Sequence, residues 1–153
     1  MNIRNFKDED IESVLKLFYD TVHSVNSKDY NNEQLKAWAP KELDRLKWIE
    51  SLNRNYSIVA EENTQIIGFG DIDSTGYLDR LYVHKNHQGK KVASNLINAL
   101  ENYIFNKGVK SIITDASITT KPFFEKKGYE VIKEQQVELR GQLFTNFKMC
   151  KNL

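Results

Sequence analysis

The stretch LDRLYVHKNHQGKKVAS, residues 78–94, joins an alternating β-rich segment to an amphipathic helix through a short glycine-containing loop. The first backbone N–H groups of a helix have no partner within it, and the helix dipole places positive charge at the same end. Gly89 and two small residues beyond it allow a ligand to approach this backbone, and Lys90 and Lys91 add positive charge. The segment therefore predicts an anion site of the kind that holds a diphosphate.

Two familiar phosphate-binding motifs are absent from this segment. It lacks the G-x-x-x-x-G-K-[ST] pattern of nucleoside-triphosphate P-loops and the G-x-G-x-x-G fingerprint of dinucleotide-binding folds. A solvated basic start of a helix explains the same residues without any ligand. Both interpretations stay open until the rest of the chain is considered.

The segments on either side of this unit alternate between helical and strand periodicity. On the N-terminal side, apolar spacing predicts a short strand at 3–6 and helices at 11–22, 33–38 and 43–52. The other predicted elements are strands at 56–60, 65–70, 77–83, 111–114, 131–139 and 143–150, and helices at 92–104 and 120–127. This order predicts an α+β fold with a mixed, mostly antiparallel sheet flanked by helices.

Length and composition narrow the class of protein. A chain of 153 residues has room for one domain, so we expect residues 1–153 to form a single one. Its 22 basic residues nearly balance its 21 acidic ones. A net charge of +1 gives no positive electrostatic field of the kind that non-specific nucleic-acid binding requires. No apolar run approaches the ~20 residues that cross a bilayer, so no membrane partner is expected. The lone Cys150 forms no internal disulfide, which favours the cytoplasm, and three scattered histidines predict no metal site.

In its context, the 78–94 segment resembles motif A of the GNAT superfamily of N-acetyltransferases, whose pattern is Gln/Arg-x-x-Gly-x-Gly/Ala at a strand-to-helix junction. Lys91 departs from that pattern because it stands where the family has its central glycine, and a Cβ there crowds the backbone if φ is positive. The residues that fit the pattern are Gln88, Gly89, Lys90, Val92 and Ala93.

Two further segments carry the same resemblance. Residues 123–129 (FFEKKGY) are similar to the family's Phe-Tyr-Glu-Lys-x-Gly-Phe segment near the C-terminus. Residues 20–40 resemble a bacterial branch of the superfamily whose acceptors are poorly defined. The order of predicted elements also matches the acyl-CoA N-acyltransferase fold over essentially the whole chain.

The resemblance implies that acetyl-CoA is the cofactor, that CoA leaves as product, and that no metal takes part. The cofactor is expected in a cleft where the strand ending at Val83 diverges from the 111–115 strand. Backbone groups of the first strand would bond the pantetheine and the acetyl carbonyl, and the amides of 88–94 would hold the diphosphate. The expected cofactor contacts are Leu81, Tyr82, Val83, Gln88, Gly89, Lys90, Lys91, Val92, Ala93, Ser94, Ser117 and Phe124.

Acetyl transfer to an amine requires a neutral acceptor nitrogen, so a positioned base is useful. Strict alternation puts Tyr77, Asp79, Leu81 and Val83 on one face of their strand, and Leu78, Arg80 and Tyr82 on the other. Family members place a base on the first of these faces, which makes Asp79 our catalytic candidate. A plain ion pair with a neighbouring Lys or Arg is the competing interpretation.

Two positions depart from the family on the side of the leaving group. The tyrosine that often protonates the CoA thiolate corresponds to Phe124, which carries no exchangeable proton. Ser117 stands where many relatives have an asparagine in contact with the cofactor, and a plain turn serine is the alternative. We expect no tyrosine acid at this site.

The helix–loop–helix segment before residue 40 covers the acceptor side of the cleft in relatives. His23, Tyr30, Trp38 and Tyr77 are therefore our candidates for substrate binding. Core packing or a dimer contact explains Tyr30 and Trp38 equally well, and a capping role explains His23. The oligomeric state stays open between monomer and homodimer.

The sequence thus predicts an acetyl-CoA-dependent N-acetyltransferase that acts on the primary amine of a small molecule by direct attack in a ternary complex. Acetylation of protein lysines or N-termini is one alternative. A non-catalytic acyl-CoA-binding sensor is another, since Lys91 and Phe124 depart from the family pattern.

Overall fold

The structure, a computed structural model, describes residues 1–153 and contains one seven-stranded sheet with five α-helices. The strands are β1 (Asn2–Asn5), β2 (Tyr56–Glu62), β3 (Gln65–Ile72), β4 (Tyr77–Val83), β5 (Ser111–Ser117), β6 (Glu130–Leu139) and β7 (Gln142–Asn152). The helices are α1 (Ile11–Ser24), α2 (Asn32–Trp38), α3 (Arg45–Arg54), α4 (Val92–Asn106) and α5 (Lys121–Lys126). Three 3₁₀ turns complete the chain: η1 (Asp8–Asp10), η2 (Asn26–Lys28) and η3 (Lys85–His87).

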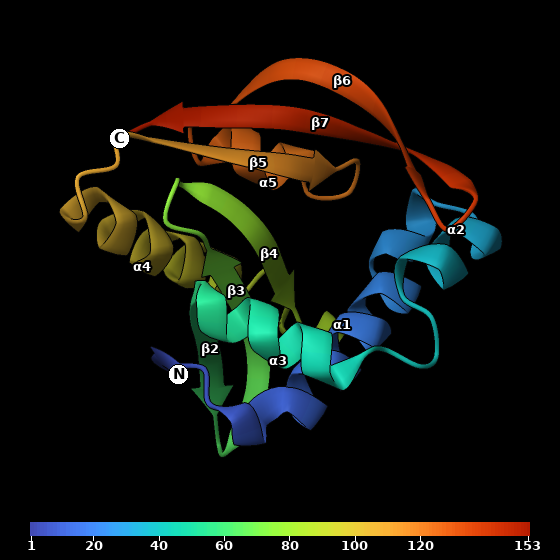
Figure 1. Cartoon of the computed structure of the whole chain (residues 1–153), viewed down its shortest axis with the longest axis horizontal. Coiled ribbons are helices and arrows are strands. Elements are labelled where there is room, and N and C mark those ends of the chain that lie inside the picture. The colour runs from blue at the N-terminus through green and yellow to red at the C-terminus, as the bar shows by residue number, and fades with distance from the viewer.

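The strand order is β1-β2-β3-β4-β5-β7-β6, and every neighbouring pair is antiparallel except β4 and β5. The parallel pair is short, because only Tyr77 with Ile113 and Leu78 with Thr114 are in register. Beyond Leu78 the two strands separate, and Figure 1 shows β4 and β5 diverging between the two halves of the sheet. This fork creates the space in which the candidate site lies.

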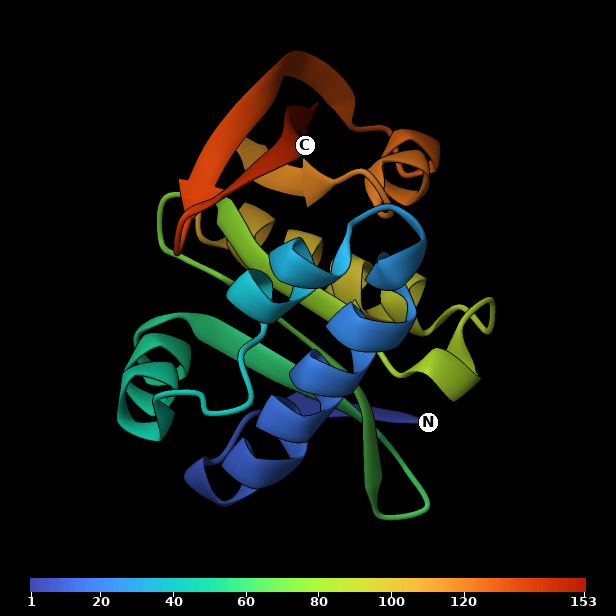
Figure 2. The same cartoon turned by 90° about the vertical axis from the view of Figure 1, so that its right-hand side faces the viewer.

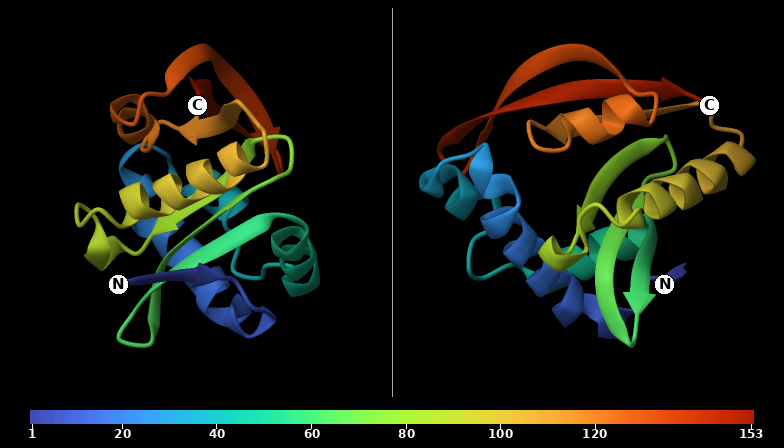
Figure 3. Two further views of the ribbon diagram at one scale, coloured as in Figure 1. Left: turned by 90° about the vertical axis from the view of Figure 1, so that its left-hand side faces the viewer. Right: turned by 180° about the vertical axis from the view of Figure 1, so that it is seen from behind.

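The helices cover the two faces of the sheet unequally. Figure 2 shows α1 and α2 in front of the sheet, while the left view of Figure 3 shows α4 across the opposite face. Each face therefore has its own apolar core. One, on the side of α4, centres on Leu96, Ile97 and Leu100, and the other, on the side of α1, includes Phe18 and Phe69. The predicted α+β class with a mixed, mostly antiparallel sheet is confirmed.

A β-bulge at Asp79 overturns the predicted alternation along β4. Asp71 pairs with Arg80 and Ile72 pairs with Leu78, so Asp79 has no opposing residue on β3. The extra residue shifts the alternation of side chains between the two faces of the sheet by one position, as bulges do. Leu78 consequently packs in the α4 core together with Leu81 and Val83, and not with Tyr82, which packs against the α1 core.

Two side chains at the starts of helices α3 and α1 take no part in packing or capping there. Leu46 lies 72% exposed at the start of α3. Asp10 is the N-cap residue of α1, but its carboxylate does not cap that helix. It accepts a hydrogen bond from the Lys7 amide at 2.9 Å and pairs with Arg4.

The last hairpin turns where the sequence predicts it. Arg140 and Gly141 both have positive φ, 47° and 81°, between the paired residues Leu139 and Gln142. Two-residue hairpin turns of this kind match the twist of the strands that they join. None of the helices combines the length and apolar character that a membrane crossing requires.

Candidate active site

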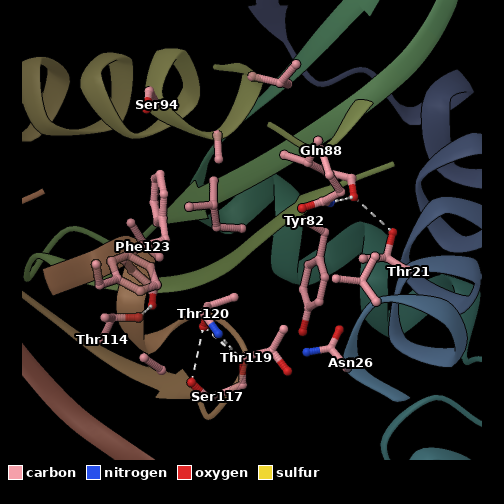
Figure 4. Close-up of a pocket in the computed structure, with 18 of the residues that line it drawn as sticks. Thr21, Asn26, Tyr82, Gln88, Ser94, Thr114, Ser117, Thr119, Thr120 and Phe123 are labelled. Carbon is pink, nitrogen blue, oxygen red and sulfur yellow. Dashed lines mark hydrogen bonds between the residues drawn. The ribbon is translucent and has the colours of Figure 1, made fainter. Parts of the chain in front are cut away.

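The fork between β4 and β5 opens into a cavity of about 420 Å³. Its walls come from β4, the β4–α4 loop, the start of α4, the end of β5, α5 and the α1–α2 connection. Figure 4 shows these side chains around one space, with Gln88 and Ser94 on one side and Ser117, Thr119 and Asn26 on the other. Segments that lie far apart in the sequence thus meet at one site.

Most of the predicted site residues line this cavity. They are Asp79, Leu81, Tyr82, Val83, Gln88, Gly89, Lys91, Val92, Ala93, Ser94, Ser117, Phe124 and Trp38. Lys90, His23, Tyr30 and Tyr77 are absent from its lining.

The β4–α4 loop reverses the chain through two left-handed residues. Gly89 has φ of 74°, and Lys91, the N-cap of α4, has φ of 66° and ψ of 13°. Glycine adopts this region freely, whereas a residue with a Cβ pays about 1–2 kcal/mol. Lys91 stands where the family pattern has a glycine, and its backbone does take the left-handed conformation that glycine adopts freely. Lys91 therefore adopts this conformation under strain.

Side chains fasten this loop to the end of β4. The Gln88 amide donates to the Val83 carbonyl at 2.6 Å, and the Thr21 hydroxyl of α1 approaches the same oxygen at 3.4 Å. The Val83 carbonyl, expected to bond a cofactor, is thus already engaged within the protein. His87 has a buried Nδ1 without a hydrogen-bond partner, and this residue also lines the cavity.

Asp79 projects from the bulge of β4 and lines the cavity with its side chain 38% exposed. Its Oδ2 lies 3.7 Å from Arg80 Nη1, so the carboxylate also has a cationic neighbour. This geometry is therefore compatible with both interpretations of Asp79, as a base and as an ion-pair partner.

Arg80 itself is held by a buried polar cluster behind β4. Its Nη1 donates to Asp71 at 2.6 Å and its Nη2 to Ser51 at 2.8 Å, while the guanidinium lies 4.6 Å from the centre of the Trp48 ring. Burial raises the pKa of Asp71 to about 6, although Arg80 and Asn55 oppose that rise. The cluster fixes the strand next to the bulge.

Three polar residues on the acceptor side were missed as site residues: Asn26, Thr119 and Lys28. All three line the cavity together with Tyr82 and Trp38. Their segments carry no motif, and only the fold brings η2 next to the turn after β5. Burial raises the pKa of Tyr82, although the Trp38 indole partly opposes this, so the phenol stays protonated.

Phe124 and Ser117 lie at the fork in ordinary structural settings. Phe124 is 3% exposed and packs edge-on against Phe123 and Tyr129, with ring centres 5.4 and 5.1 Å apart. The Ser117 hydroxyl is 2.9 Å from the Thr120 hydroxyl and accepts from the Thr120 amide at 3.1 Å. Ser117 thus has the contacts of a turn serine while facing the cavity.

Two predicted substrate residues, His23 and Tyr30, make contacts outside the cavity. His23 Nε2 lies 2.8 Å from the Ala39 carbonyl, and its ring packs on Tyr19. Tyr30 is 6% exposed, and its hydroxyl donates to Thr145 and accepts from the Ile118 amide. These bonds tie α1, α2 and β7 together, so they explain both residues without a substrate.

Tyr77 lines a second, more polar cavity of about 330 Å³. Its hydroxyl donates to Asp115 Oδ2 at 2.8 Å, and Gln135 of β6 donates to Asp115 Oδ1 at the same distance. Asp115 lines both cavities, so the second one lies next to the first. No group of three histidine, cysteine or carboxylate side chains is arranged as metal ligands.

Comparisons with known proteins agree with this geometry. The model of the Acetyltransferase (GNAT) domain matches residues 26–151. The N-acetyltransferase YafP of Escherichia coli (strain K12) is 37% identical over 150 residues, which is 97% of this chain and 94% of that protein.

Solved structures show the same fold. A GCN5-related N-acetyltransferase from Rhodopseudomonas palustris superposes with a TM-score of 0.96 at 29% identity, over 99% of this chain and 95% of that one. The PaiA N-acetyltransferase of Thermoplasma acidophilum, solved in complex with coenzyme A, has a TM-score of 0.81 at 20% identity, over 99% and 98% of the two chains.

Proposed function

The chain belongs to the GNAT family of N-acetyltransferases, and from that premise we propose that it acetylates the primary amine of a small molecule by direct attack in a ternary complex. One observation carries the proposal. A single cavity connects the β4–α4 loop, at one end, with Asp79 at the fork of β4 and β5. Acetyl-CoA, with its diphosphate at the first end, and an amine at the second end can therefore occupy this cavity together.

The loop end fits coenzyme A. Gly89 and Lys91 turn the backbone into α4 in the left-handed region, Lys91 brings a cation, and His87 Nδ1 is a buried nitrogen without a partner. A helix N-terminus of this kind favours negative charge. When bound, acetyl-CoA supplies an activated acetyl thioester. Beyond Leu78, β4 has no strand partner on the side of β5, which leaves backbone groups other than the engaged Val83 carbonyl available to the pantetheine arm.

Asp79 is our candidate for the base. A lysine-like amine has a pKa near 10.4, so its neutral form costs about 4–5 kcal/mol at pH 7. A carboxylate that lines the cavity beside the fork removes that proton directly or through a water molecule. Arg80 Nη1, at 3.7 Å, gives this carboxylate a cationic neighbour that restrains its position.

Phe124 leaves the departing thiolate without a tyrosine acid. A thiol with a pKa near 8.5 is a fair leaving group, so the proton can come from solvent after the C–S bond breaks. The ammonium nitrogen loses two protons on its way to the amide. Asp79 takes the first before attack, and the second leaves the nitrogen as the tetrahedral intermediate collapses and the C–S bond breaks. The CoA thiolate takes up one proton from solvent, so the reaction releases one proton net.

The second cavity favours one alternative acceptor. The second cavity adjoins the first at Asp115, and a longer acceptor could contact both. A protein lysine or an N-terminus would use the second cavity, whereas a small amine would not.

Two measurements test the proposal. CoA and acetyl-CoA should raise the melting temperature, since a ligand at 100 times its Kd adds about 2.7 kcal/mol of stability. A panel of amines and short peptides, followed by thiol release, should then show turnover with small amines. Stabilisation by CoA without turnover of any acceptor would point to a sensor, and the absence of stabilisation would overturn the cofactor assignment.

A further inference from the structure

Asn26 is a buried amide without a partner at the acceptor side of the cavity. The residue begins η2 and is 3% exposed, and its only hydrogen bond is that of its backbone carbonyl with the Asp29 amide at 3.1 Å. Figure 4 shows its side chain extending toward the Tyr82 hydroxyl and Thr119. The side-chain amide forms no hydrogen bond within the protein and borders the cavity, so it is free to donate to a ligand bound there.

The groups around Asn26 are mostly donors. The Tyr82 phenol is held by edge-on contact with Phe18, with ring centres 5.0 Å apart, and its raised pKa keeps it a neutral O–H donor. Lys28, on the same turn as Asn26, lines the cavity and forms no ion pair. Asp29, the acid of this turn, accepts a hydrogen bond from the Thr119 hydroxyl at 2.8 Å.

The same cavity also carries acids. Asp79 and Asp115 lie on β4 and β5 at the fork and both line the space. An ammonium group is favoured beside these carboxylates, and an oxygen acceptor, best an anionic one, is favoured beside Asn26, Tyr82 and Lys28. One cavity thus carries groups that complement both ends of a zwitterion.

We infer that the acceptor is a primary amine with a free carboxylate, of the α-amino acid type, and that Asn26 is a specificity-determining residue that donates to that carboxylate. The inference rests on the proposed acetylation of an amine and refines its substrate class. Tyr82 donates to the same carboxylate, and Lys28 contributes long-range attraction.

The test compares matched acceptors. Phenylalanine, phenylalaninamide and phenethylamine form one series, and leucine, leucinamide and isoamylamine form a second. In the wild-type enzyme, kcat/KM for the amino acid should exceed that for each neutral-tailed analogue at least tenfold. The carboxamides have less basic amines than the amino acids, so the difference in amine ionisation works against this result.

Variants of Asn26 separate recognition from folding. Asn26→Ala should raise KM for phenylalanine about tenfold or more, with the Kd of acetyl-CoA changed less than twofold. Asn26→Asp should repel the carboxylate and reverse the order, so that phenethylamine becomes the better acceptor. Lys28→Met should reduce the preference severalfold, while Lys41→Met, an exposed lysine outside the cavity, serves as the matched control.

The outcomes are distinct. Equal or faster turnover of the amides and amines by the wild type would overturn the inference and leave amine acetylation intact. Preserved discrimination in Asn26→Ala, with an unchanged melting temperature, would remove Asn26 from recognition. Stabilisation by CoA without turnover of any amine would overturn the proposed function, and this inference with it.

Discussion

Arg80 on β4 and Asp71 on β3 form an ion pair across the sheet, with Nη1 2.6 Å from Oδ2 and the Asp71 side chain fully buried. The same Nη1 lies 3.7 Å from Asp79. The Arg80 guanidinium therefore contacts both a buried carboxylate and the candidate base. Because Asp79 sits on a bulge with no partner of its own, this contact restrains the strand at the point where the cavity opens.

The first prediction concerns the pH dependence of stability. The folded state holds the Asp71 proton with a pKa of about 6, against an ordinary value of 3.8. Folding is then linked to proton uptake, so this group makes the free energy of unfolding fall as pH rises from about 4 to 6, by about 3 kcal/mol at most. Urea denaturation across that range should show the decline in the wild type and a flatter curve in Asp71→Asn.

Other groups contribute to the wild-type curve, so the difference between the two proteins is the informative quantity. The pKa of His84 is lowered by burial and by His87, which gives a contribution of opposite sign near pH 6. It is common to both proteins and cancels. Parallel curves for wild type and Asp71→Asn would contradict the prediction.

The second prediction concerns the base. Asp79→Asn keeps the size of the side chain and removes its ability to take a proton, so kcat should fall by roughly 10²–10⁴ with the Kd of CoA unchanged. Asp8→Asn is the matched control, because Asp8 is an exposed aspartate that lines neither cavity. Its kcat should change less than about tenfold. An unchanged rate in Asp79→Asn would remove this residue from the mechanism.

The third prediction concerns the strained N-cap of α4. Lys91→Gly relieves a left-handed residue of its Cβ and should raise the free energy of unfolding by about 1 kcal/mol. Lys90→Gly changes the neighbouring lysine, which has no positive φ, and should bring no gain. Chemical denaturation of both variants measures the difference, and equal stabilities would show that Lys91 is unstrained.

The fourth prediction concerns the packing of α4 on the sheet. A Cβ at Gly68 of β3 would lie 3.0 Å from Leu96 Cδ1 and Val92 Cγ1, so Gly68→Ala should displace the first turns of α4. We expect a loss of about 1–3 kcal/mol in stability and weaker CoA binding. Gly108→Ala strains the other end of α4 without any contact within 4 Å, so it should lower stability but not CoA affinity. Calorimetric titration of CoA into both variants separates the two effects.

The sequence was most informative where local chemistry acts alone. The β-rich segment 77–83, the apolar stripe of 92–104, and the Arg140–Gly141 turn each follow from short-range sterics and burial, and each predicted element is present. The strand-loop-helix unit at 78–94 likewise follows from residues that are neighbours in the chain. For the same reason, the positions of Gln88, Gly89 and Lys91 at the cavity were predictable.

The sequence was least informative about side chains whose surroundings come from distant segments. His23, Tyr30 and Tyr77 are polar or aromatic residues that look suitable for a substrate, yet the fold gives them protein partners in Ala39, Thr145 and Asp115. Asn26 has no motif around it and was overlooked, although the fold leaves its amide unpaired.

By itself, then, the sequence determined the class of fold, the family and the loop that begins α4, because periodicity and motif are properties of contiguous residues. The tertiary structure decided which face of β4 each side chain takes beyond Asp79. The bulge at Asp79 shifts the strand register by one residue, and the amino-acid composition does not reveal that shift. It also decided which polar groups remain unpaired in the cavity, because hydrogen bonds between η2, β4 and the turn after β5 form only after these segments have been brought together.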